Sequence, residues 1–354
     1  MAGPDISSTL LAVGDEKDWD SYLKFLRQGH LLTKHGIRFV TTDYDSVLGD
    51  SLPAVETGVV VLFLFFPFEY WDRHIEPRRY TGVYGSKEFY SKLKRFWRTV
   101  GKKLRRGYGD RKLVFINDPD DIPPERDKEA TKRLLRRAGI ATPRAYRTRD
   151  LDKVTDLLRE GRRFFIKVRY GSMGKGITYL EQDRWLTNFV FRKNRILNRH
   201  SDHGWRFRDV TGNRAFLAEL LKGDIVVEEA VPRWLIRGRH FDLRALVFRN
   251  KVLYMYPRSN SADKVTTNVS QGARSETMRF LADVPKRLLK EAERTALGAA
   301  RALGLDFAGV DMMLDPDRNS TVVIELNAFP GFPKVRRFNL AKHLVREIGG
   351  TRWK

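Results

Sequence analysis

The chain has 354 residues, 42% of them hydrophobic, which is enough apolar material for at least two packed domains and excludes disorder over the whole chain. Lys and Arg outnumber Asp and Glu by 67 to 44, and the net charge of +23 favours polyanionic partners. No cysteine is present, so disulfides, cysteine-ligated metals and thiol nucleophiles are excluded. The longest apolar run, residues 59–68, is too short to span a membrane, and the first residues lack a signal-peptide pattern. We therefore expect a cytoplasmic protein without a membrane partner.

The first 120 residues alternate between apolar strands and helices. The pattern predicts two helices, at 18–34 and 86–104, and four strands, at 10–13, 38–42, 59–66 and 113–116. Because continuously apolar strands that alternate with helices are typical of a parallel sheet, we predict an α/β domain over residues 1–120. The turn-rich, proline-containing stretch at 117–124 is the expected boundary.

The remaining two thirds of the chain predict antiparallel sheets with helices. A basic helix is expected at 126–138, ended by Gly139, and a second helix at 284–303. Short strands are expected at 164–168, 177–180, 225–231, 245–248 and 252–256. The last two strands, 307–314 and 321–326, are joined by the turn-forming sequence DPDRNS and should form a hairpin.

A lysine followed by glycines marks a candidate phosphate site. The sequence FFIKVRYGSMGKG combines a strand that carries Lys167 with a loop that contains Gly171, Gly174 and Gly176. Glycines allow backbone N–H groups to approach a phosphate closely, and the lysine adds a positive charge. The lysine precedes the glycines, so this is not a Walker loop. A glycine-rich hairpin with a surface lysine is the alternative.

Three oxygen-bearing side chains converge on the predicted hairpin. The two-residue period of a strand puts Glu325 and Asn327 on one face, and the hairpin brings Asp311 alongside them. Mg²⁺ prefers oxygen ligands and commonly takes one or two carboxylates plus nucleotide phosphates. The alternative is that these residues are simply the solvent face of the hairpin.

The region between these motifs offers groups suited to the rest of a nucleotide. A strand edge at residues 229–231 can present its backbone to an adenine, and Asp242 can accept hydrogen bonds from ribose hydroxyls. Arg244, Arg258 and Asn268 are candidate donors to phosphate or to charge on a reacting acyl group.

Taken in order, the motifs resemble the ATP-grasp superfamily and specifically its carboxylate–amine ligases. The matching stretches are RDKEATKRLLRRAGIATPR, FIKVRYGSMGKGI, VVEEAV, FDLRALV, MYPRSN, TNVSQGA, GVDMML and VIELNAFPGF. The resemblance covers residues 112–345 and is strongest to ribosomal-protein glutamate ligases and to lysine-biosynthesis ligases that act on an acidic carrier protein. FDLR is also similar to tubulin tyrosine ligases.

The resemblance implies a fold and its division. The fold class is α/β (α+β), an ATP-grasp fold with an N-terminal Rossmann-like pre-ATP-grasp domain at 1–120. A central subdomain at 121–232 would hold the glycine-rich loop, and a C-terminal subdomain at 233–354 would hold the magnesium site.

The resemblance also implies roles for individual residues. It makes Lys128 and Lys167 the phosphate-binding lysines, the loop a lid over the phosphates, and the VVEEAV strand the adenine hinge. The nucleotide-binding residues are then Lys128, Lys167, Gly171, Ser172, Met173, Gly174, Lys175, Gly176, Glu228, Glu229, Ala230, Val231 and Asp242. The catalytic residues are Arg258, Asn268 and Arg244, and the ligands of one or two Mg²⁺ ions, which Mn²⁺ can replace, are Asp311, Glu325 and Asn327.

Two features depart from the family or stand outside its motifs. Ala273 replaces the second glycine of the NxxxGG segment. Residues 92–112 carry ten Lys and Arg and one acid (+9), and residues 184–214 carry eight and two (+6), so two segments supply +15 of the +23. Because the second segment is longer than the corresponding connection in relatives, we expect it to be exposed and mobile, to lie near the nucleotide and to bind an acidic substrate.

The implied reaction has two steps. A carboxylate attacks the γ-phosphate of Mg·ATP to give an acyl phosphate and ADP, and an amine then displaces phosphate. We expect a ligase that acts on an acidic small molecule, peptide or carrier protein, with homo-oligomerisation left open. A phosphotransferase of the inositol-polyphosphate kinase type is the alternative, since its terminal strand is similar to VIELNAFPGF. A nucleic-acid-binding protein without catalysis would explain the charge but not the ordered ATP and metal motifs.

Overall fold

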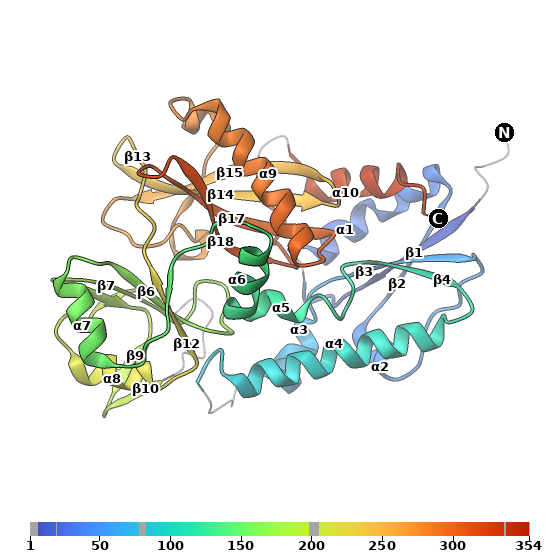
Figure 1. The fold of residues 1–354 in the computed structure, drawn as a ribbon. Helices are drawn as coiled ribbons and strands as arrows, with labels where there is room; N and C mark the ends of the chain where they lie inside the picture. The colour runs from blue at the N-terminus through green and yellow to red at the C-terminus, as the bar shows by residue number, and fades with distance from the viewer. Residues whose placement is uncertain (1–5, 19, 78–82, 198–204, 336–337, 354) are drawn as a thin grey trace.

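The computed structural model describes residues 6–18, 20–77, 83–197, 205–335 and 338–353. Figure 1 shows three units, each built on its own sheet: an N-terminal unit in blue and cyan, a central unit in green and yellow, and a C-terminal unit in orange and red. The sheets fall within the predicted limits 1–120, 121–232 and 233–354, although this division stays a prediction. No helix in the described part of the chain has the length and apolar character to cross a membrane.

The N-terminal sheet is parallel, with strand order β2-β1-β3-β4. Its strands are β1 (Ser8–Val13), β2 (Ile37–Thr42), β3 (Val59–Leu64) and β4 (Lys112–Ile116). Its helices are α1 (Tyr22–Gly29), α2 (Tyr44–Leu48), the short α3 (Phe68–Tyr70) and α4 (Lys87–Gly107), with a 3₁₀ segment at His30–His35 and a π turn at Trp71–Ile75. Alternate residues of β1 enter two cores: Leu11 packs with Trp97 of α4, and Leu10 packs with Phe25 of α1. The predicted parallel sheet covered on both faces is confirmed.

The central unit is an antiparallel sheet covered by two helices. Its strand order is β11-β8-β7-β6-β12-β5. The strands are β5 (Ala145–Tyr146), β6 (Phe164–Val168), β7 (Ile177–Glu181), β8 (Arg184–Thr187), β11 (Arg208–Asp209) and β12 (Ile225–Glu229), with β9 (Val190–Arg192) and β10 (Arg195–Leu197) as a separate hairpin. Helices α7 (Leu151–Arg159) and α8 (Arg214–Leu221) pack their apolar residues, such as Val154 and Leu217, into one core with Phe164 and Ile166 of β6. Neither helix was expected.

The C-terminal sheet has the order β16-β15-β14-β17-β18, with β13 paired to β14. Its strands are β13 (Leu235–Ile236), β14 (Arg239–Phe248), β15 (Lys251–Ser261), β16 (Arg274–Ser275), β17 (Phe307–Asp315) and β18 (Ser320–Asn327). The long helix α9 (Lys286–Ala302) lies on the sheet through apolar residues at helical spacing, Leu288, Ala292, Ala296 and Ala299. Short 3₁₀ turns occur at Val269–Gln271 and Met278–Leu281. Helix α10 (Leu340–Gly349) returns to pack on α1 of the N-terminal unit.

The basic helix predicted at 126–138 is present at Lys128–Arg137 and begins two residues later than predicted. Helix α5 (Pro123–Arg126) ends at Asp127, whose backbone is extended and whose side chain accepts hydrogen bonds from the N–H groups of Glu129 and Ala130. Helix α6 (Lys128–Arg137) therefore starts at Lys128. The Asp127 N-cap explains this start, because its side chain accepts hydrogen bonds from backbone N–H groups that have no partner within the first turn of α6.

The expectation that the segment at 184–214 is exposed was wrong for its aromatic residues, while its expected mobility stays a prediction. Strand β8 joins the central sheet, and Trp185, Phe189 and Trp205 are buried in its core. Aromatic residues interleaved with the charges anchor the segment by burying apolar area. Its cations at the β9–β10 hairpin are exposed as expected, and residues 198–204 lie outside the described residues.

Asn117, at the end of β4, joins the N-terminal unit to the C-terminal sheet. Its side-chain amide donates to the carbonyls of Phe307 (2.7 Å) and Ala328 (3.2 Å), and its Oδ1 accepts from the N–H of Phe307 (2.8 Å). Asn117 is buried and has a φ of 62°, a left-handed conformation that asparagine tolerates better than most residues. One side chain thus satisfies three backbone groups between the two units.

We predict that Asn117→Ala lowers the free energy of unfolding by about 3 kcal/mol, because it leaves buried backbone groups unpaired and strains a left-handed residue. Asn117→Gly removes the same hydrogen bonds without the strain and should cost about 1 kcal/mol less. Calorimetric unfolding of both variants measures the two effects. Equal losses would show that the left-handed backbone plays no part.

Candidate active site

Buried charges form a row across one face of the C-terminal sheet. Asp242 on β14 lies opposite Arg258 on β15, Arg244 lies opposite Asp311 on β17, and Asp311 lies opposite Glu325 on β18. Arg244 donates two hydrogen bonds of 2.6 Å to Asp311. Arg258 donates to Asp242 at 2.8 Å and lies 3.2 Å from Asp311. Cross-strand pairing therefore brings the predicted ribose acceptor, two catalytic arginines and two metal ligands into one network.

The two aspartates of this row differ in their electrostatic balance. Burial raises the pKa of Asp242, because attraction to Arg258 and the hydrogen bond from Thr267 only partly offset the loss of water. Burial would also raise the pKa of Asp311, but Arg244 and Arg258 outweigh it, so that pKa lies below its usual value. Asp311 is thus held as a carboxylate by two guanidinium groups.

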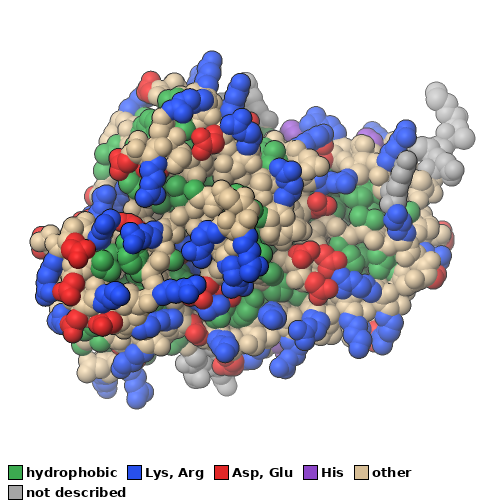
Figure 2. Space-filling model, in the orientation of Figure 1, with side chains coloured by type: hydrophobic (Ala, Val, Ile, Leu, Met, Phe, Trp, Pro, Cys, Tyr) green, Lys and Arg blue, Asp and Glu red, His purple; other side chains and the backbone are tan. Residues whose placement is uncertain are grey.

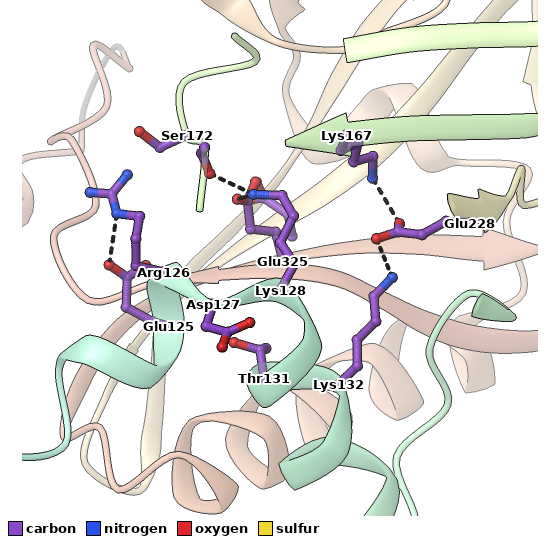
Figure 3. A network of polar contacts seen from close by, with 12 residues as sticks. Glu125, Arg126, Asp127, Lys128, Thr131, Lys132, Lys167, Ser172, Glu228 and Glu325 are labelled. Atoms are coloured by element: carbon purple, nitrogen blue, oxygen red, sulfur yellow. Dashed lines mark hydrogen bonds and ion pairs between the residues drawn. The ribbon is translucent and has the colours of Figure 1, made fainter. Parts of the chain in front are cut away.

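A second buried cluster contains Lys132, Glu228 and Lys167. Figure 3 shows the two lysines approaching Glu228 from opposite sides, with Lys167 Nζ 3.0 Å from Oε2 and Lys132 Nζ paired with Oε1. Burial would raise the pKa of Glu228, but the two lysines lower it to about 2. Burial lowers the pKa of Lys132 to about 8, against the attraction of Glu228. Glu228 therefore orients Lys167 from the neighbouring strand β12.

Lys132 did not stand out in the sequence. It lies in a strongly basic helix, where a lysine ordinarily faces solvent, yet its side chain is buried. The available signal was its spacing of four residues from Lys128, which places both lysines on one side of α6.

Lys128 is held where the three units meet. Its Nζ donates to the carbonyl of Gly171 (2.5 Å) and lies 3.2 Å from Glu325 Oε1. Arg169, just after β6, donates two hydrogen bonds of 2.7 Å to Asp127, the N-cap of α6. The start of α6 is thus locked to the end of the lysine-bearing strand, which fixes Lys128 between the glycine-rich loop and the β18 carboxylate.

The glycine-rich loop is held by side chains from all three units. The N–H of Ser172 donates to Tyr84 Oη (3.0 Å), and the amides of Asn188 and Gln271 both donate to the carbonyl of Gly174 (2.7 Å each). Gly174 has a positive φ of 70°, and a Cβ on Gly171 would lie 2.1 Å from Val168 Cγ2, so a side chain fits at neither position without strain.

Two cavities, of about 960 Å³ and 110 Å³, share one wall. The residues that line both are Ser172, Lys175, Arg258, Asn268, Asp311 and Glu325. All six are among the residues assigned from the sequence. The smaller cavity has apolar walls that suit an adenine, formed by Phe165, Ile177, Phe241, Val265, Met313 and Ile324.

The other predicted residues divide between these cavities. Only the smaller one is lined by Lys128, Lys167, Gly171, Gly174, Glu228, Glu229, Val231 and Asp242. Only the larger one is lined by Met173, Arg244 and Asn327, and neither is lined by Gly176 and Ala230. No described residue of 184–214 lines either cavity, and the segment reaches the site through Asn188, which bonds Gly174, and through Trp205, which packs on Tyr84.

The predicted adenine hinge is partly used by the protein itself. The N–H groups of Glu229 and Ala230 donate to the carbonyls of Arg144 and Arg163, at 2.8 Å each. These two groups are therefore not available as donors to an adenine in this structure. Of the predicted hinge, Val231 and the backbone carbonyls remain as groups that can contact an adenine.

The oxygen-bearing side chains on β17 and β18 fit a magnesium ion that also binds phosphates. Asp311 and Glu325 are adjacent carboxylates, and the buried amide nitrogen of Asn327 has no acceptor among the described residues, so it suits a phosphate oxygen rather than the cation itself. No group of three or more His, Cys, Asp or Glu that could hold a metal occurs in the described ranges. A hard cation here would therefore take most of its oxygen ligands from a nucleotide and water.

We predict that Glu228→Gln destabilises the protein by about 3 to 5 kcal/mol, since it leaves two cations, one of them fully buried, without a counter-charge. Lys132→Met should cost less, because Glu228 keeps Lys167. Denaturant unfolding at pH 7 measures both, and Glu229→Gln, at a half-buried pair with Arg162, is the control at below about 1 kcal/mol.

The pH dependence provides a second check. The pKa of Glu228 falls from 4.5 to about 2 on folding, so its contribution is present above pH 4.5 and is lost as the pH falls towards 2. The stability difference between wild type and Glu228→Gln should narrow over that range. A loss no larger than that of Glu229→Gln at pH 7 would contradict the role given to this cluster.

Comparison with known proteins identifies the family. The chain is 26% identical to a probable α-L-glutamate ligase of Vibrio vulnificus over 224 residues, which is 63% of this chain and 62% of the relative. Its fold resembles the ATP-grasp ligase PsnB complexed with a minimal precursor (TM-score 0.56, 14% identity, 97% and 98% of the two chains). It also resembles the macrocyclase MdnC bound to its precursor peptide, from Microcystis aeruginosa (0.56, 12%, 97% and 100%), and a D-alanine–D-alanine ligase of Bacillus anthracis (0.51, 14%, 97% and 92%).

These likenesses confirm the ATP-grasp fold predicted from the sequence. The chain spans about 62% of the length of the first curated relatives it matches. The YheC/D-like ATP-grasp family model matches residues 128–347, more than half of the chain. The chain therefore belongs to the YheC/D-like ATP-grasp family.

Proposed function

We propose that this protein is an ATP-dependent carboxylate–amine ligase that forms an amide or peptide bond through an acyl phosphate and releases ADP and phosphate. The observation that carries the proposal is the wall shared by the two cavities, which consists of lid, catalytic and metal-ligand candidates. A nucleotide in the smaller cavity would meet an acid in the larger cavity at this wall. Phosphoryl transfer depends mainly on such positioning and on charge neutralisation.

The chain's own residues supply most of that neutralisation. Lys167 and Lys128 each keep ammonium donors beyond those that their protein partners accept, and Arg258 has five N–H donors of which Asp242 and Asp311 use only part. Mg²⁺ bound by Asp311, Glu325 and Asn327, or Mn²⁺ in its place, would neutralise charge on the phosphates. Asn268 lies on the shared wall, where it can donate to the oxygen of the reacting acyl group.

The walls of the larger cavity favour a ligase over a polyphosphate kinase. Acidic residues Asp18, Asp72 and Glu125 line it together with Arg126 and Arg244. Lys17 and Lys175 line it too, so the wall carries both signs of charge and matches an acid and an amine together better than a polyphosphate, which carries only negative charge. The larger cavity thus suits both substrates that a ligase joins, the acid and the amine.

Nucleic-acid binding is not favoured by the distribution of charge. On the face shown in Figure 2, Lys and Arg side chains lie over all three units with acidic side chains among them, rather than in one patch. Binding to nucleic acid ordinarily uses a clustered basic surface.

A peptide or carrier protein is our proposed source of the carboxylate. Solved relatives in fold are complexed with precursor peptides, and curated relatives are named glutamate ligases. The larger cavity, at about 960 Å³, is roomy enough to admit the end of a peptide chain. We propose a cytoplasmic location and leave the oligomeric state open.

The proposal is tested by incubating the protein with Mg·ATP, a panel of acids and peptides, and hydroxylamine, which converts an acyl phosphate into a hydroxamate. We expect acid-dependent ADP release with hydroxamate formation. Glu325→Gln should reduce both by at least ten-fold, because it removes a metal ligand candidate and the partner of Lys128. Transfer of phosphate to a hydroxyl group of an added polyol phosphate, without hydroxamate, would instead support a phosphotransferase.

The cations of the β9–β10 hairpin provide a further prediction. Arg192, Lys193 and Arg195 are exposed and line neither cavity, so they can act on an acidic substrate only at a distance. Reversing all three to Glu should raise the KM for a polyanionic peptide roughly five-fold at low salt, and much less at 1 M salt where the screening length is about 3 Å.

The control makes the same change in charge elsewhere. Lys94, Arg95 and Arg98 are exposed on α4, in the other basic segment, and should tolerate reversal with an unchanged KM. The KM for ATP should stay within about two-fold in both variants. Equal effects of the two triple variants on the peptide KM would show that only net charge matters.

A further inference from the structure

Glu125 and Arg126, neighbours at the end of α5, form a buried acid–base pair outside the cluster assigned to the nucleotide. Burial raises the pKa of Glu125 to about 7, so this carboxyl group gains from a further cation beside it. They are 8% and 7% exposed, and both line the larger cavity. Neither was assigned a role from the sequence. Charged side chains are rarely buried to this degree unless their hydrogen bonds are satisfied.

The Nε–H group of Arg126 is not satisfied by any described residue. Its Nε lies 3.7 Å from Glu125 Oε1, too far for a hydrogen bond, and this buried N–H has no acceptor among the residues that the structure describes. The guanidinium instead rests over the rings of Trp71 (5.4 Å) and Phe66 (5.9 Å). A planar donor fixed on aromatic faces, with an open N–H in a cavity, is suited to a carboxylate.

The position of the pair assigns it to the acceptor side of the site. Glu125 and Arg126 line only the larger cavity and not the smaller one. Yet Arg126 is two residues from Lys128, which contacts Glu325 on the shared wall. In the view of Figure 3, Lys128 and Glu325 lie between the Glu125–Arg126 pair and the Lys132–Glu228–Lys167 cluster. A ligand on Arg126 would therefore sit beside the transferred group, on the side away from the buried lysine cluster.

We propose that Arg126 and Glu125 bind the carboxylate and the ammonium group of a free α-amino acid, whose nitrogen is the nucleophile of the second step. This inference rests on the proposed ligase function. An α-amino acid carries its two charges on one carbon atom, so it needs a cation and an anion side by side. Adjacent side chains 3.7 Å apart meet that requirement, and neither a peptide amide nor a lysine side chain carries both charges so close together.

The bond changes balance without another reactant. The ammonium loses one proton to water and attacks as the amine, forming a C–N bond to the acyl carbon. The C–O bond to phosphate breaks, with its electron pair leaving on the phosphate. The nitrogen then loses a second proton to give the amide. Glu125 and Arg126 act in this scheme as binding residues that aim the nitrogen.

The test compares an amino acid with its amide. The twenty L-amino acids are screened for amide formation with an acid that gives hydroxamate, and the best one is compared with its α-carboxamide, in which the carboxylate is replaced by a neutral group. We expect wild-type kcat/KM to be at least ten-fold lower for the carboxamide, and Arg126→Gln to reduce this preference to below three-fold. Equal use of the two compounds by the wild type would overturn the inference.

Hydroxylamine separates this inference from the function on which it rests. Because hydroxylamine has no carboxylate, Arg126→Gln and Glu125→Gln should lower the ratio of amide to hydroxamate at least ten-fold. A wild type that makes no hydroxamate contradicts the ligase function itself. A wild type that makes hydroxamate but uses no amino acid contradicts only this inference. If Arg126→Gln lowered the yields of amide and hydroxamate equally, Arg126 would instead bind a carboxylate of the activated acid. That result would also overturn the inference.

Two further variants exclude a merely structural effect. Arg126→Lys keeps the charge and the stem over Trp71 but lacks the planar fork, so it should fold and retain an intermediate preference. Arg133→Gln changes an exposed arginine on α6 that lines neither cavity, and should keep the wild-type ratio of products. If Arg126→Lys folded and kept the full wild-type preference, the role of the fork would be refuted.

Discussion

Charge balance inside the site is the constraint on which the rest of the structure depends. Arg244 and Arg258 share two buried aspartates, and Lys132 and Lys167 share one buried glutamate. Unpaired charges at these depths would cost several kcal/mol each, so every strand and helix that carries one must be fixed relative to its partner. The same contacts that stabilise the fold therefore set the geometry of the two cavities.

These pairings also explain why the site suits anionic ligands. Around the smaller cavity, two lysines face one glutamate, and Lys128 and Arg258 keep donors beyond their protein partners. These donors belong to compact, partly buried networks rather than to exposed side chains, so salt screens them little. Phosphates entering the cavity would meet donors that are already oriented, which lowers the reorganisation needed for reaction.

The sequence predicted those parts of the site that depend on strand periodicity. The turn DPDRNS fixes the hairpin, so the placement of Asp311 beside Glu325 follows from a two-residue period. The parallel N-terminal sheet followed in the same way from continuous apolar runs. Burial of charged helix residues could not be predicted, because a basic helix such as α6 looks solvated whether or not Lys132 turns inward. The Glu125–Arg126 pair depends on the break at Asp127 and on aromatic rings from a distant segment, and neither can be read from local pattern.

The glycine-rich loop is the segment of the site that contacts side chains from all three units. Tyr84 comes from the N-terminal unit, Asn188 from the central unit and Gln271 from the C-terminal unit, and all three hold the loop between the cavities. Because the loop contributes Ser172 and Lys175 to the shared wall, its position controls access from one cavity to the other. A loop tied to three units moves only when at least one contact breaks, so any movement of the loop is coupled to the arrangement of the three units. The aromatic residues that bury the 184–214 segment thereby act on the site, since they fix Asn188 where it reaches the loop.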